Sequence, residues 1–188
     1  MIEAKKLNEL KDRAYQCAIA HGWHEENLSD EHFLCLVISE LMEAVEADRK
    51  ENHADTDAFN RYYNCVNFKE NFERQIKGTV EEELADACIR LLDLAGLRSV
   101  DLGEVDLDEL KCSEGFFNWS FTDAIFSLVC NITDTDYIET HSFDSFLRVA
   151  LVEILVFCVQ KEIDIFWYIE QKMKYNELRP YKHGDKSY

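Results

Sequence analysis

Two short stretches decide the fold of this chain, because each predicts a helix that carries acids on an apolar face. They are SELMEAVEADR at residues 39–49 and VEEELADACIR at residues 80–90. The paired acids are Glu40 with Glu43, and Glu83 with Asp86. Residues three apart lie on one face of an α-helix, so each pair shares a face with the leucines, valines and alanines around it.

Acids beside a buried face are costly unless something pairs with them. No Lys or Arg stands at a helical spacing that would bridge both acids of either pair. If the two helices pack antiparallel, four carboxylates converge, and such oxygens hold Mg²⁺ together with phosphate oxygens. The alternative interpretation is a solvated acidic face, which explains most single E-x-x-E patterns.

The composition predicts one all-α domain. A length of 188 residues fits a single domain, and 47% hydrophobic residues are enough for a core. One proline and six glycines leave room for long helices, because both residues interrupt them. The net charge of −18 disfavours nucleic acid or an anionic membrane as a partner.

The seven cysteines predict free thiols and a cytoplasmic location. Their number is odd and no C-x-x-C occurs, which argues against a disulfide framework or a zinc site. The charged segment 1–10 lacks the apolar core of a secretory signal. No apolar run is long enough to span a bilayer, so we expect no membrane partner.

Apolar periodicity and capping residues predict six well-defined helices, at residues 3–20, 31–50, 80–94, 120–132, 143–161 and 164–176. Ser29 or Asp30 can cap the second helix, and Gly96 is expected to end the third. Thr79 and Glu82 have the spacing of a capping box, which favours Glu83 and Asp86 as the metal candidates. Residues 51–78 predict a helix followed by a further helix or a flap, and a short helical piece is expected before residue 111.

The helices at 120–132 and 143–161 repeat the apolar pattern of the acid helices without their acids. Sliding 80–97 onto 143–160 keeps the apolar spacing but places Glu83 on Phe146 and Asp86 on Val149. We interpret residues 116–176 as a degenerate second copy of the helical pair, with chance matching of apolar helices as the alternative. The single domain then comprises a metal-binding half (1–102), an inserted or degenerate second half (103–165), and a C-terminal helix with a basic tail (166–188).

Three blocks together resemble the MazG-like family of all-α nucleoside triphosphate pyrophosphohydrolases. They are the two acid helices and KMKYNELRPYKHG at residues 172–184, in the family's order. The matched parts, 21–49, 79–102 and 170–186, cover under half of the chain. The resemblance implies a helical bundle with a MazG-like four-helix core.

The chain departs from the family pattern in two places. The spacer between the acid pairs is longer than usual, because residues 51–78 are expanded. Residues 103–163 intervene where relatives have a short connection. Since family members often build a site from two or more chains, both a homodimer and a pseudo-dimer within one chain stay open.

The resemblance also implies a role for each candidate residue. The Mg²⁺ ligands would be Glu40, Glu43, Glu83 and Asp86, with Mn²⁺ as a substitute ion. Lys172, Asn176 and Arg179 would approach the nucleotide phosphates, and Trp23 would lie near the base. Glu43 is the preferred acceptor of the proton from the attacking water, and Glu46 is the alternative.

The expected function is hydrolysis of a nucleoside triphosphate, with a deoxynucleotide preferred, to a monophosphate and pyrophosphate. Water would attack the α-phosphorus, and positioning and charge stabilisation would supply most of the catalysis. One alternative is a nucleotide sensor of the same fold that binds without turnover. Two others are a structural helical scaffold and a ferritin-like di-iron protein, whose Glu-x-x-His motifs the acid helices lack.

Overall fold

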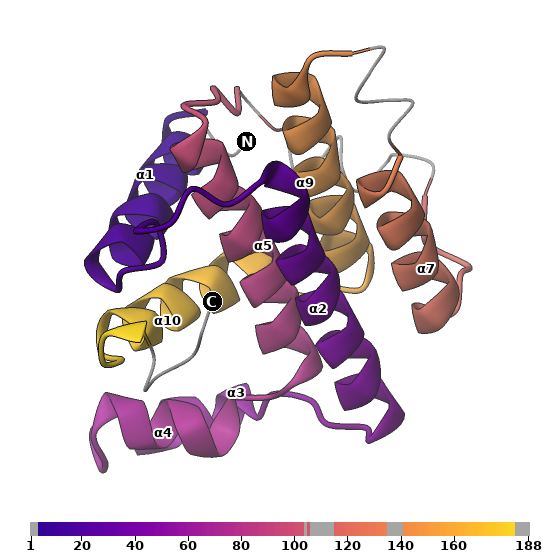
Figure 1. The fold of residues 1–188 in the computed structure, drawn as a ribbon. Helices are drawn as coiled ribbons and strands as arrows, with labels where there is room; N and C mark the ends of the chain where they lie inside the picture. Colours follow the sequence, from indigo (N-terminus) through magenta and orange to yellow (C-terminus); the bar gives the residue numbers. More distant parts are fainter. Residues whose placement is uncertain (1–3, 104, 106–114, 135–140, 183–188) are drawn as a thin grey trace.

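A computed structural model describes residues 4–103, 105, 115–134 and 141–182. All regular secondary structure in these ranges is helical, which confirms the all-α prediction (Figure 1). The helices are α1 (Ala4–Ala20), α2 (Asp30–Arg49), α3 (Thr56–Tyr62), α4 (Phe68–Gln75), α5 (Val80–Leu97), α7 (Phe121–Ile132), α9 (Phe143–Gln160) and α10 (Ile165–Glu177). Within the described part of the chain, no helix combines the length and apolar character needed to cross a membrane.

Helix α5 lies at the centre of the molecule and packs against α1, α2, α9 and α10 (Figure 1). Twelve of its 18 residues are buried, as expected for a helix that is apolar on nearly every side. Helix α2 runs antiparallel to α5 and packs closely against it (Figure 1). This pairing sets the two acid pairs face to face, as the sequence predicted for an antiparallel arrangement.

The start of α5 differs from the predicted capping box. Thr79 is the N-cap residue, but its hydroxyl donates to the Ile76 carbonyl at 2.7 Å and accepts no capping hydrogen bond from α5. The Glu82 carboxylate accepts from the Gly78 N–H at 2.8 Å, one residue before the N-cap. By contrast, α2 begins as predicted, since the Ser29 hydroxyl accepts from the His32 N–H at 3.3 Å.

The predicted end of α5 at Gly96 is wrong, because the helix continues to Leu97. Gly96 lies against α1, where an added Cβ would meet the Cβ of Tyr15 at 2.5 Å. This glycine therefore allows close packing of two helices and does not terminate one.

Residues 51–78 form the two short helices α3 and α4. Asp55 and Asn67 cap them, each accepting from a backbone N–H three residues on. The buried Asn71 amide donates to the Phe59 carbonyl at 2.8 Å and joins the two helices. The predicted helical piece before residue 111 falls outside the described residues.

Helices α7 and α9 form the second half of the bundle. Helix α7 lies beside α2, α9 lies beside α5, and the two pack on each other (Figure 1). Each thus adjoins its suggested counterpart in the first half. The tandem repeat and the pseudo-dimer themselves stay predictions.

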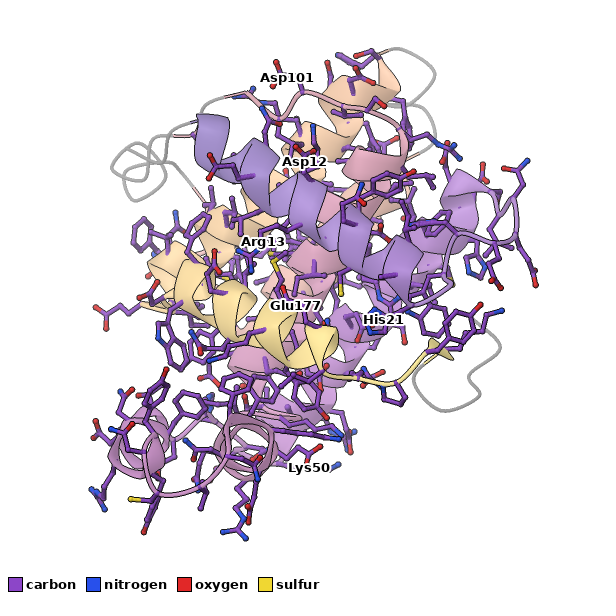
Figure 2. All side chains as sticks on the ribbon, turned by 90° about the vertical axis from the view of Figure 1, so that its left-hand side faces the viewer. Asp12, Arg13, His21, Lys50, Asp101 and Glu177 are labelled. Atoms are coloured by element: carbon purple, nitrogen blue, oxygen red, sulfur yellow. The ribbon has the colours of Figure 1, made fainter. Side chains whose placement is uncertain are left out.

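Helix α10 crosses α5 and also contacts α1, α4 and α9. On the α1 side, Arg13 reaches Glu170 at 2.8 Å. It also reaches Glu177 at 3.7 Å, and both Arg13 and Glu177 are labelled in Figure 2. On the α4 side, the rings of Tyr175 and Phe72 stack with centroids 4.5 Å apart. These contacts hold the third sequence block over the α5 face that carries the acids.

Candidate metal and nucleotide site

A carboxylate triad lies between α2 and α5. Glu40 and Glu43 on α2 and Glu83 on α5 each offer an oxygen within 4.8 Å of the others. Glu40 and Glu83 are buried, whereas Glu43 is exposed. The triad therefore opens towards solvent on the Glu43 side, and three of the four predicted metal ligands are brought together.

Glu83 is the most constrained of the three acids. Its residue is only 8% exposed, and no hydrogen bond or ion pair within the described ranges reaches its carboxylate. Burial, reinforced by the Glu82 and Asp86 carboxylates, raises the pKa of Glu83 to about 9. An unpaired buried acid is unfavourable unless it serves as a ligand, so the donor set fits a hard divalent cation.

Glu40 is buried but has a cationic partner. The Arg90 guanidinium on α5 reaches its Oε1 atom through Nε at 3.1 Å and Nη2 at 3.0 Å. Burial and the Asp86 carboxylate raise the pKa of Glu40 to about 7, although Arg90 opposes the rise. The sequence prediction missed Arg90 as a partner because the pair joins two helices.

Asp86, the fourth predicted ligand, has a different partner. The Lys172 ammonium on α10 lies 2.6 Å from its Oδ2 atom and also contacts Glu82. Lys172 is only 4% exposed. Burial alone would lower the pKa of Lys172, but Asp86 and Glu82 outweigh it and raise the pKa above its usual range. Lys172, predicted to bind phosphate, thus lies among the acids.

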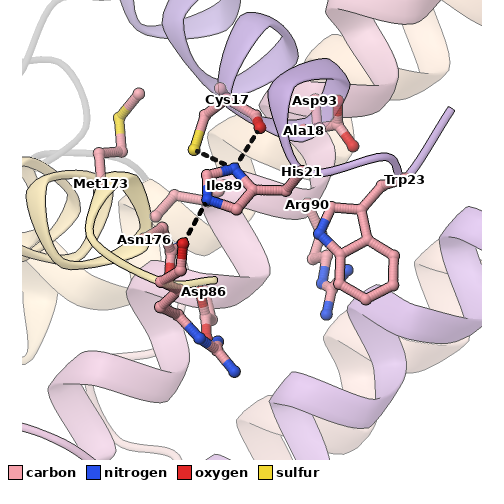
Figure 3. Close-up of a pocket in the computed structure, with 12 residues that line it drawn as sticks. Cys17, Ala18, His21, Trp23, Asp86, Ile89, Arg90, Asp93, Met173 and Asn176 are labelled. Carbon is pink, nitrogen blue, oxygen red and sulfur yellow. Dashed lines mark hydrogen bonds between the residues drawn. The ribbon is translucent and has the colours of Figure 1, made fainter. Parts of the chain in front are cut away.

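The other predicted substrate residues gather around one pocket. Trp23, Asn176 and Arg179 line it together with Asp86 and Arg90 (Figure 3). The Asn176 Oδ1 atom is buried there without a hydrogen-bond partner among the described atoms. The pocket volume is about 60 Å³. Because ligand pockets usually measure roughly 300–1,000 Å³, this pocket must widen to admit a nucleotide.

Segments from opposite ends of the chain close the pocket. One His21 ring nitrogen lies 3.0 Å from the Arg179 carbonyl oxygen (Figure 3), and the Lys182 N–H donates to the His21 carbonyl at 3.1 Å. The Tyr181 hydroxyl donates to Glu25, and Lys182 pairs with the same carboxylate at 3.2 Å. We call residues 179–182 the closing segment.

A buried His24–Asp93 pair at the wall of the pocket was not predicted. The His24 Nε2 atom lies 2.8 Å from the Asp93 Oδ1 atom, and burial raises the pKa of Asp93. Asp93 also lines the pocket. The one sequence signal was an acid among leucines at residues 91–94.

Glu46, the alternative proton acceptor, lies on the exposed side of α2. It pairs with Arg49 at 2.9 Å and with Lys50 at 3.1 Å. Ion pairing lowers the pKa of Glu46, chiefly through Lys50. Glu46 is therefore already paired and lies outside the triad, whose exposed acid is Glu43.

Comparison with family models, curated proteins and solved structures gave no match to this chain. The geometry defines a class of site: a carboxylate triad in an all-helical protein, adjoining a small pocket with an aromatic and a cationic lining. The MazG-like resemblance rests on the three sequence blocks alone.

Proposed function

We propose that this protein hydrolyses a nucleoside triphosphate, with a deoxynucleotide preferred, to the monophosphate and pyrophosphate in a Mg²⁺-dependent reaction. The single observation that carries the proposal is Glu83, a buried acid that lacks a partner among the described residues and faces two other acids. The substrate class comes from the resemblance of the three sequence blocks to the MazG-like family.

Glu40, Glu43 and Glu83 would hold the ion, and Mn²⁺ would substitute for Mg²⁺. When bound, the ion supplies charge neutralisation for the triphosphate and increases the acidity of water. Glu43 is suited to accept the proton of the attacking water because it is the exposed acid of the triad. Glu46, whose carboxylate already has two cationic partners, is the weaker candidate.

The pocket adjoins the triad through two lining residues that interact with acids of the triad. Arg90 lines the pocket and pairs with Glu40, while Asp86 lines the pocket and affects the pKa of Glu83. A nucleotide in the widened pocket would therefore have its phosphates near the triad. There Arg179 offers a guanidinium for bidentate pairing with phosphate.

Asn176 and Trp23 would complete substrate binding. The resemblance implied that Asn176 approaches the phosphates, but its acceptor oxygen has no protein donor among the described residues and would accept from the sugar or base instead. The Trp23 indole would pack against the base.

The test incubates the purified chain with Mg²⁺ and paired ribo- and deoxyribonucleoside triphosphates, and separates the products by chromatography. We expect monophosphate and pyrophosphate from the wild type and none from Glu83→Gln. The control variant is Glu153→Gln on α9, which neutralises a half-buried acid bonded to Asn131 and remote from the triad; it should retain activity.

Other outcomes separate the alternatives. Diphosphate and phosphate as products would show that water attacks a different phosphorus, which contradicts the proposed reaction. Binding of a nucleotide to the folded protein without any turnover would support the sensor.

A further inference from the structure

The Lys172 ammonium bridges two of the acids, Glu82 and Asp86. It contacts Asp86 at 2.6 Å and Glu82, and it lies 5.9 Å from the centroid of the Tyr175 ring. Its 4% exposure excludes a solvated side chain that merely passes the site. The ammonium therefore acts as a fixed, buried cation.

Both carboxylate oxygens of Glu82 already have a partner within the protein. It is 1% exposed, its Oε1 atom contacts Lys172, and its Oε2 atom accepts from the Gly78 N–H at 2.8 Å. A carboxylate that is fixed at both oxygens cannot turn towards the triad without breaking a buried bond. The acidic region is thus divided into two halves, and Glu82, Asp86 and Lys172 form one of them.

The triad is the other half, and its charges are far less compensated. Arg90 reaches only Glu40, through a single carboxylate oxygen. No hydrogen bond or ion pair from the described residues reaches the carboxylate of the buried Glu83. Positive charge is thus supplied to Glu82 and Asp86 by the protein, and the triad is left to an ion from solution.

Helix α10 is anchored on two sides, so Lys172 cannot withdraw by a simple rotation. Tyr175, one turn away, stacks on Phe72 and donates through its hydroxyl to Glu73 at 2.9 Å. Glu170, two residues before Lys172, is bonded to Arg13 on α1 at 2.8 Å. A second divalent ion at Asp86 would have to share the carboxylate with this ammonium, and two adjacent cations repel.

We propose that Lys172 is the permanent cation of the Glu82–Asp86 half, so that the chain binds one divalent ion, at Glu40, Glu43 and Glu83. Asp86 then does not ligate that ion. This proposal rests on the metal site of the proposed function, and it departs from the four-ligand set that the resemblance implies. Removing the ammonium while keeping the side-chain length should open a second ion site.

The test counts Mn²⁺ ions bound by the nucleotide-free protein, by calorimetric titration and by the loss of the free-Mn²⁺ electron paramagnetic resonance signal. We expect one ion for the wild type and two for Lys172→Met. Two ions in the wild type, or one in folded Lys172→Met, would overturn the proposal.

A matched pair of variants decides the ligand set even where Lys172→Met does not fold. Glu83→Gln removes a ligand and should weaken Mn²⁺ binding by about a hundredfold or more, whereas Asp86→Asn should weaken it by roughly tenfold or less, the effect of a neighbouring charge. Equal losses in the two variants would refute the proposal. Circular dichroism and thermal unfolding confirm that each variant is folded.

The ion count and the hydrolysis assay test separate claims, so either claim can be contradicted without the other. One bound ion without hydrolysis would contradict the proposed function and leave the role of Lys172 intact. Two ions bound by the wild type, together with hydrolysis, would contradict the role of Lys172 and leave the proposed function intact.

Discussion

Replacing Glu83 by glutamine should stabilise the metal-free protein, although it removes a group that the function needs. Glu83 as a residue is 8% exposed, and burial is the largest cause that raises its pKa from 4.5 to about 9. Glutamine has nearly the same shape and never ionises. The variant therefore avoids the cost of holding an acid that prefers to be ionised in water.

The magnitude follows from proton linkage. Between pH 4.5 and 9 the folded protein keeps the Glu83 proton and the unfolded chain has lost it, so wild-type stability falls as pH rises through this window. At pH 7 the full linkage from pH 4.5 is about 3.5 kcal/mol, at roughly 1.4 kcal/mol per pH unit, and solvent screening of the partly accessible carboxylate reduces it to about 3 kcal/mol. At pH 4 both states are protonated and the difference between wild type and Glu83→Gln should vanish.

The assay is thermal and urea unfolding at pH 4, 7 and 8 in the presence of a chelator. For a chain of this size, 3 kcal/mol corresponds to a melting temperature higher by roughly 6–12 °C for the variant at pH 7. Mg²⁺ at about one hundred times its dissociation constant adds roughly 2.7 kcal/mol to the wild type alone. The gap should then close, because Glu83→Gln has lost a ligand.

The matched control is Glu46→Gln on the exposed side of α2, which should show neither effect. Two results would refute the reasoning. One is a Glu83→Gln variant that is less stable than the wild type at pH 7 without metal. The other is a stability difference that does not change between pH 4 and pH 8. Either would mean that the Glu83 carboxylate already has a stabilising partner.

Two further substitutions test the surroundings of the site. Gly22→Ala, at φ 78° and against the Tyr181 ring, should cost at least about 1 kcal/mol more in urea unfolding than Gly78→Ala, at φ 74° with open space around it. Equal losses of unfolding free energy in the two variants would show that the closing segment moves away from an added Cβ without cost, which contradicts tight packing against Gly22. Arg90→Gln should cost about 1–2 kcal/mol at pH 8 and clearly less at pH 5, where Glu40, with its pKa near 7, is protonated and no longer needs a cation. A loss that is the same at both values of pH would contradict this pairing.

The acid pairs were predictable because helical periodicity is a local property. Spacing of three placed Glu40 with Glu43, and Glu83 with Asp86, on single faces, and the apolar neighbours predicted that those faces meet. The position of Lys172 was not predictable in the same way. Its contact with Glu82 spans 90 residues of sequence, and no periodicity within one helix encodes a partner on another.

Gly96 shows a second limit of local rules. Glycine after an apolar helical run predicts a helix end, because glycine adopts left-handed conformations readily. Here the absence of a side chain is used for contact with Tyr15, and packing between α1 and α5 outweighs the weak helix propensity of glycine. A single sequence does not distinguish these two uses.

The closing segment also affects the order in which the molecule can fold. Its contact with His21 joins residues 158 positions apart, whereas Arg90 and Glu40, beside the triad, are 50 positions apart. Closing a longer loop costs more entropy, so the α2–α5 pair can form while the chain end is still free. Ion binding would then be acquired before the pocket in refolding, and Mn²⁺ uptake that lagged behind pocket closure would contradict that order.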